Sequence, residues 1–181
     1  MAKSAITTYG EALFQTALES SSCFQMLDEV KLLKRILAEN GELKSIMLNP
    51  RFSKEEHLSI IENVFKGRID ERLYAFLELL VQKGRYNYLD EILDYFIVLV
   101  KDHLQIGQAT VTSATEIDED IRKSIKDKLL ATTGYKGIEV VYEVDPSLIG
   151  GMVIRIKDRI VDNSVKTKLE NIIRDLHKIQ V

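Results

Sequence analysis

The sequence is poor in residues that form disulfides, thiolate metal sites and flexible linkers. Its 181 residues include one cysteine, Cys23. No internal disulfide can form, and no zinc site can be built from thiolates alone. Two prolines and nine glycines are too few for a long disordered or collagen-like segment. A single cysteine in a chain of this length is typical of a reducing compartment.

Long hydrophobic runs are also missing. The longest, Phe96 to Val100, has five residues, whereas roughly 20 are needed to cross a bilayer as a helix. The N-terminal stretch MAKSAITTYGEALF lacks the apolar core of a signal peptide. We therefore expect no direct membrane insertion, and any attachment to a membrane to pass through a partner.

Neither the charge nor the histidines indicate a nucleic-acid site or a metal site. The 25 basic and 28 acidic residues give a net charge of −3, whereas nucleic-acid binders depend on a basic field. His57, His103 and His177 are far apart and form no metal-binding motif. We expect each of them on a solvated helix face. The sequence thus predicts no nucleic-acid partner, no metal and no cofactor.

The first 105 residues have a helical period of apolar residues throughout. Ser53 and Glu56 form a capping-box pattern at the start of one helix, and Asn40-Gly41 ends another. Short loops between helices favour a compact bundle. The expected helices are 4–19, 22–39, 42–48, 53–65, 70–83 and 87–104.

Two of these helices have apolar arcs wider than one core contact requires. Phe14 widens the arc of the first helix, and Leu79 and Val81 flank that of the fifth. One explanation is that each helix is wedged between several neighbours. The other is that part of each arc meets a partner.

The pattern changes after about residue 105. We expect strands at 109–115, 138–144 and 152–156 and helices at 117–132 and 165–179. The fold class is therefore mainly α: an N-terminal six-helix bundle, residues 1–105, followed by a small α+β domain, residues 106–181, in the order strand-helix-strand-strand-helix. About 75 residues are close to the lower limit for an independent domain.

The segment from Asp145 to Ile173 has a specific order but no recognisable chemistry. Gly150-Gly151 precedes a strand, so it indicates a backbone requirement rather than a phosphate loop. Asp162 or Ser164 is the expected cap of the last helix. No nucleophile, base or ligand set stands out anywhere in the chain, so we expect no catalytic residues and no enzyme activity.

Three motifs in register resemble one family, the delta subunit of bacterial F-type ATP synthases, whose mitochondrial counterpart is the oligomycin-sensitivity conferral protein. The most specific is the run Asp145 to Ile156, DPSLIGGMVIRI, which is followed by Asp162-Asn163-Ser164. Residues 9–14, YGEALF, resemble the opening Tyr-Ala-x-Ala-Leu-Phe of the family, with Gly10 in place of the usual alanine. Residues 79–86, LLVQKGRY, resemble its Leu-x-x-Asn-x-Arg segment, with Lys83 in place of the common asparagine.

The resemblance implies a non-catalytic stator connector that lies on the cytoplasmic face of the cell membrane as a peripheral protein. In this family the helical bundle binds N-terminal helices of alpha subunits in a groove between its first and fifth helices. The C-terminal domain holds the C-terminal end of the b subunit. Because the two wide arcs lie on these helices, we expect Tyr9, Phe14, Leu79 and Val81 near that groove.

A small helical RNA-binding or antitermination-type module is the alternative, because small helix bundles also serve that function. The acidic pI of about 5.7 and the lack of a clustered basic and aromatic surface argue against it.

Overall fold

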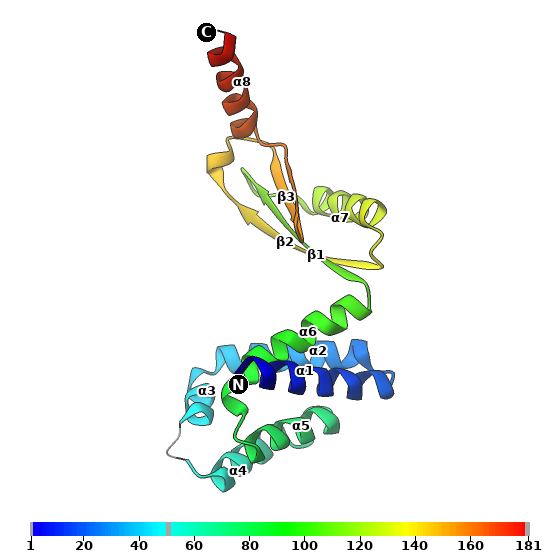
Figure 1. The fold of residues 1–181 in the computed structure, drawn as a ribbon, viewed down its shortest axis with the longest axis vertical. Helices are drawn as coiled ribbons and strands as arrows, with labels where there is room; N and C mark the ends of the chain where they lie inside the picture. The colour runs from blue at the N-terminus through cyan, green and yellow to red at the C-terminus, as the bar shows by residue number, and fades with distance from the viewer. Residues whose placement is uncertain (1, 50–51, 180–181) are drawn as a thin grey trace. The chain divides into compact units, whose positions relative to one another are not determined.

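The computed structural model describes residues 2–49 and 52–179, which form two compact units, residues 1–104 and 105–181 (Figure 1). Each unit is described by itself. The first contains a short 3-10 helix, η1 (Tyr86–Tyr88), and, within the described residues, the six expected α-helices: α1 (Ala2–Glu19), α2 (Cys23–Glu39), α3 (Gly41–Leu48), α4 (Lys54–Phe65), α5 (Glu71–Gln82) and α6 (Leu89–His103).

Local sequence signals fix several helix ends in this unit. The expected capping box is present at the start of α4: the Ser53 hydroxyl accepts from the Glu56 amide, and the Glu56 carboxylate accepts from the Ser53 amide. The Asp70 side chain caps α5 by accepting from the Arg72 amide. Each bond satisfies an amide that has no partner inside the helix.

Helix α1 packs tightly against α6 in the bundle core. Gly10 is buried, and a Cβ atom at this position would lie 2.6 Å from Cδ1 of Tyr95 on α6. The glycine therefore allows close contact between the two helices and explains the departure from alanine. Leu13 and Ala17 follow on the same buried stripe of α1. Lys34 of α2 forms an ion pair with Asp94 of α6 and ties a third helix to this contact.

Two expectations about individual side chains are wrong. The helical period of apolar residues predicts Phe24 in the core, but its side chain is 64% exposed, because it lies about 120° around α2 from the stripe that Met26 and Leu27 bury. His57 was expected on a solvated face but is 1% exposed. It shares the inner face of α4 with Ile61 and packs against the ring of Tyr86 at a centroid distance of 4.7 Å.

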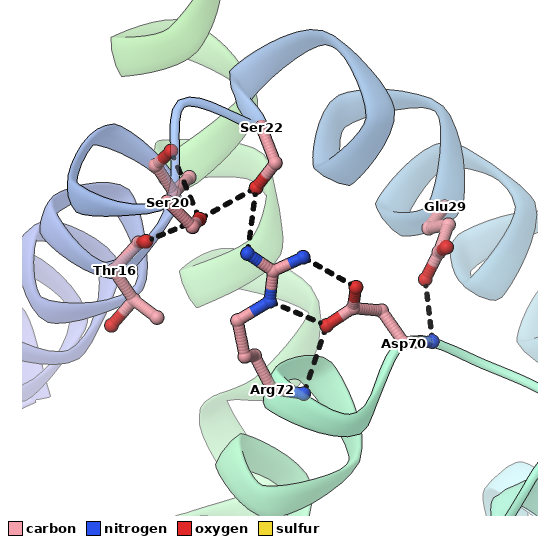
Figure 2. A network of polar contacts seen from close by, with 7 residues as sticks. Thr16, Ser20, Ser22, Glu29, Asp70 and Arg72 are labelled. Carbon is pink, nitrogen blue, oxygen red and sulfur yellow. Dashed lines mark hydrogen bonds and ion pairs between the residues drawn. The ribbon is translucent and has the colours of Figure 1, made fainter.

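A polar network joins the start of α5 to the turn between α1 and α2 (Figure 2). Arg72 donates through Nε and Nη2 to Asp70, at 2.8 and 2.5 Å, and through Nη1 to the hydroxyl of Ser22 at 3.0 Å. The Asp70 amide donates to the Glu29 carboxylate of α2 at 2.7 Å. The hydrogen bonds from Arg72 lower the pKa of Asp70. The network therefore fixes the position of α5 relative to the first two helices.

The second unit is a mixed four-stranded sheet with two α-helices, within the described residues. Its elements are β1 (Ile106–Ser113), α7 (Glu119–Thr133), β2 (Gly137–Val144), the 3-10 helix η2 (Pro146–Leu148), β3 (Met152–Ile156), β4 (Arg159–Asp162) and α8 (Val165–Ile179). The strand order is β2-β1-β3-β4, with β2 parallel to β1 and the other pairs antiparallel. The expected order of elements is confirmed, with β4 as an additional strand.

Helix α7 covers one face of this sheet. Ile125 and Leu129 of α7 form a core with Ala109 and Val111 of β1 and Ile138 of β2. The second helix, α8, contributes no residue to this cluster. The core of the unit is thus built by one helix on the sheet.

The glycine pair and the Asp162-Asn163-Ser164 segment hold the start of α8. Gly151 has φ +75°, and a Cβ atom here would lie 2.3 Å from the Asn163 carbonyl oxygen. The Ser164 hydroxyl accepts from the Thr167 amide at 3.2 Å. The Asp162 carboxylate accepts from the Ser164 amide at 2.8 Å and from the Thr167 hydroxyl at 2.7 Å, and these bonds lower its pKa. The segment therefore serves backbone geometry and capping.

Candidate partner-binding surfaces

The described residues offer no constellation for catalysis or metal binding. No group of three or more His, Cys, Asp or Glu side chains within residues 2–49 and 52–179 is placed to hold a metal ion. Cys23 is buried, and burial raises the pKa of its thiol, which disfavours the nucleophilic thiolate. The unfilled apolar surfaces are therefore the candidate sites.

The first surface lies between α1 and α5. Arg72, Phe76 and Leu79 are spaced at i, i+4 and i+7, so they share one face of α5. Arg72 on this face reaches the turn at the end of α1, so the start of α5 lies beside the end of α1. Leu79, 38% exposed, lies seven residues further along α5. At 1.5 Å per residue, this places it about 10 Å along the helix from Arg72.

One side of α1 has small and aromatic residues. Tyr9, Ala12 and Thr16 are spaced at i, i+3 and i+7 and lead toward the Ser20-Ser22 turn that Arg72 contacts. Tyr9 is half-buried and Ala12 is exposed. We call Tyr9, Ala12 and Leu79 the α1–α5 surface.

The other two expected groove residues lie in different environments. The ring of Phe14 meets the ring of His103 edge-on, at a centroid distance of 5.7 Å, and therefore faces α6. Val81 is fully buried and lies on the α5 flank that also includes Tyr74. A partner on the surface of the bundle can reach Tyr9, Phe14 and Leu79, whereas Val81 supports the surface from inside.

The second surface is one face of α8. Its apolar residues form a stripe about 100° wide, the width that normally faces a core, yet each is between 37% and 57% exposed. We call these residues the α8 stripe: Val165, Leu169, Ile172, Ile173 and Leu176. In Figure 1 the helix leaves the end of the sheet and projects away from it, with η2 beside its first turn.

The sequence pattern identified the α8 stripe but not its exposure. Residues with this spacing normally face a core, because amphipathic helices usually cover their own sheet. The sheet already has α7 as its cover, and the capped start of α8 directs the helix away. The α8 stripe is therefore left exposed within the described residues of this unit.

Comparisons with known proteins identify relatives of the whole chain. The sequence profile of the ATP synthase delta (OSCP) subunit family matches residues 6–176. An ATP synthase subunit delta of Lachnoclostridium phytofermentans is 47% identical over the full length of both chains. A chloroplastic subunit delta of Emiliania huxleyi is 34% identical over 164 residues, 91% of each chain.

A solved structure shows the same fold. One chain of the Toxoplasma gondii mitochondrial ATP synthase hexamer superposes with a TM-score of 0.69 at 15% identity, over 94% of this chain and 96% of that one. Within residues 2–49 and 52–179, no helix is long and apolar enough to cross a membrane. The family match spans both units, so the chain belongs to the ATP synthase delta (OSCP) subunit family, whose members are non-catalytic stator connectors of the F-type ATP synthase.

Proposed function

We propose that this connector has one binding site on each unit. Residues 1–105 bind the N-terminal helices of alpha subunits, and residues 106–181 bind the C-terminal end of the b subunit. The chain thereby lies on the cytoplasmic face of the membrane as a peripheral component. The observation that supports this division best is that each unit has its own unfilled apolar surface, and the α8 stripe is the larger of the two.

The α8 stripe suits a helical partner. Burying a large aliphatic side chain completely contributes about 1.5–3 kcal/mol, and the five stripe residues are about half exposed. A partner helix that covers them gains roughly 1 kcal/mol per residue before the cost of association. The end of the b subunit, presented as an amphipathic helix, is the occupant that we assign to this stripe.

The α1–α5 surface suits a helix in a groove. Leu79 and Tyr9 form its walls, Ala12 leaves room for close approach, and Phe14 extends the apolar area toward α6. The buried Val81 supports the wall on α5. The Arg72 network fixes the spacing of the two walls before a peptide arrives, which reduces the ordering cost of binding.

Amide hydrogen exchange of the full-length chain tests the assignment. An alpha N-terminal peptide is expected to slow exchange in α1 and α5, whereas a soluble fragment from the C-terminal end of b slows it in α8, because bound surfaces open less often. Protection of α8 by the alpha peptide, or of α1 and α5 by the b fragment, would contradict the division.

A further inference from the structure

The outer edge of β2 is long and unpaired. Residues 137–144 pair with β1 over the whole strand, from Gly137 opposite Ile106 to Val144 opposite Ser113. On the other side of β2, no strand within the described residues is its neighbour. The opposite edge of the sheet, β4, has only four residues and has charged residues at both ends. Short, charged edges discourage pairing with another chain, and long regular edges permit it.

Every second residue of β2 directs its amide to the free edge of the sheet and its side chain to the α7 face. The Asp145 amide donates to the Ser113 carbonyl of β1 at 2.8 Å. Because backbone groups alternate along a strand, the amides of Ile138, Val140, Tyr142 and Val144 point to the free edge. Their register with the buried residues of β1 places their side chains on the α7 face. An added strand would therefore bond to the four residues that also face α7.

A cleft runs between α7 and this edge. It has a volume of about 770 Å³. Its lining combines apolar and charged residues: Ile138, Glu139, Val140 and Tyr142 of β2 and Glu119, Asp120, Arg122, Lys123 and Lys126 of α7. An extended segment beside β2 would place every second side chain in this cleft, against Ile138, Val140 and Tyr142.

The wall of the cleft is held in place by Tyr142. Its hydroxyl donates to the carbonyl of Arg122 at 3.0 Å, and the Arg122 guanidinium lies 4.9 Å from the centre of its ring. The strand and the helix are thus linked across the cleft, so the site exists before any segment enters it.

The opposite face of β2 includes two acidic residues. Glu139 and Glu143 lie on the face away from α7, with the exposed Val141 between them, in register with Gln108 and Thr112 of β1. Opposite charges on neighbouring strands of one face stabilise the pair. Lysine side chains on an added strand would meet these carboxylates.

We propose that the β2 edge binds an extended segment of a partner protein by strand addition. The segment alternates apolar residues, which enter the α7 cleft, with lysines, which lie beside Glu139 and Glu143. This site is separate from the α8 stripe and does not depend on which subunit occupies that stripe.

A capped heptapeptide that alternates lysine and valine, with lysine at both ends, is the probe. Titrated into the 15N-labelled full-length chain, it is expected to shift the amides of Ile138, Val140, Tyr142 and Val144 and to slow their hydrogen exchange at least about tenfold. The same peptide with glutamate in place of lysine should bind at least about tenfold more weakly, since it meets like charges. Shifts confined to other elements, or equal binding of both peptides, would overturn the proposal.

Two matched pairs test the backbone bonds directly. Val140→Pro removes an outward amide and leaves the ladder to β1 intact, so it should abolish peptide binding, whereas Val140→Ala should retain it. Two N-methylated peptides give a test that needs no protein variant: one is methylated on its lysine amides and the other on its valine amides. Because only one of these sets of amides points toward β2, one peptide should lose binding and the other should retain it. Binding that survives both methylations contradicts strand addition. Protection of β2 against hydrogen exchange that increases with protein concentration in the absence of peptide would also contradict the proposal, because a second copy of the chain would then occupy the edge.

Discussion

Replacing Ile172 and Leu176 with glutamate is expected to weaken binding of the soluble b fragment at least about 100-fold. Both side chains lie in the middle of the α8 stripe and are more than half exposed in the free chain. Losing two such contacts removes about 2–3 kcal/mol, burying the new carboxylates adds a further cost, and 1.4 kcal/mol corresponds to tenfold in affinity. The fold should be unaffected, because neither residue belongs to the core of the second unit. Calorimetric titration of the purified variant measures the effect.

The matched control for this variant lies on the other side of the same helix. Asn171→Glu with Arg174→Gln changes the net charge by the same amount, and both positions are exposed on the polar face of α8. The control should bind the b fragment with nearly unchanged affinity. If both variants weaken binding equally, charge rather than the α8 stripe controls the interaction.

Replacing Leu79 with glutamate is expected to weaken binding of an alpha N-terminal peptide at least about 30-fold. The side chain forms a wall of the α1–α5 surface and is 38% exposed in the free chain. A bound helix would bury the carboxylate beside apolar groups without a partner, which costs about 2 kcal/mol or more. The variant should unfold at a temperature close to that of the original chain, because partly exposed positions tolerate charge. Fluorescence anisotropy of a labelled peptide gives the affinity.

Three further substitutions separate the possible positions of the peptide. Asn63→Glu, exposed on α4, introduces the same charge away from the surface and should have no effect. Phe14→Glu should reduce affinity less than Leu79→Glu, because its ring faces α6. Val81→Ala should lower the free energy of unfolding by about 2 kcal/mol and leave the affinity nearly unchanged, because the residue is buried. A larger loss for Phe14→Glu than for Leu79→Glu would move the site toward α6.

The helices were predictable where capping and periodicity agree. Ser53 with Glu56 marked the start of α4, and the Ser164 cap was recognisable before α8. The strand β4 was missed, because its four residues, Arg-Ile-Val-Asp, read as a charged turn. A strand this short has too few positions to reveal an alternating pattern, and only pairing with β3 defines it.

Burial was less predictable than helix boundaries. A histidine has no fixed preference, so the position of His57 depends on the neighbouring rings that enclose it. The same limit applies to the candidate site. The sequence shows that α8 has an apolar stripe, but only the packing of α7 on the sheet shows that this stripe is left uncovered. The family resemblance, by contrast, was available from three short motifs and is confirmed by the match over residues 6–176.

The central claim is that one chain binds two partners at once through separate units. Sedimentation velocity of the full-length chain, mixed with a labelled alpha N-terminal peptide and a soluble b fragment, tests it most directly. We expect a single complex that contains one copy of each, with each affinity changed less than about twofold by the other partner, since sites without coupling bind independently. Displacement of the alpha peptide by the b fragment, or a complex that never contains both, would contradict the claim that the chain binds both partners at once.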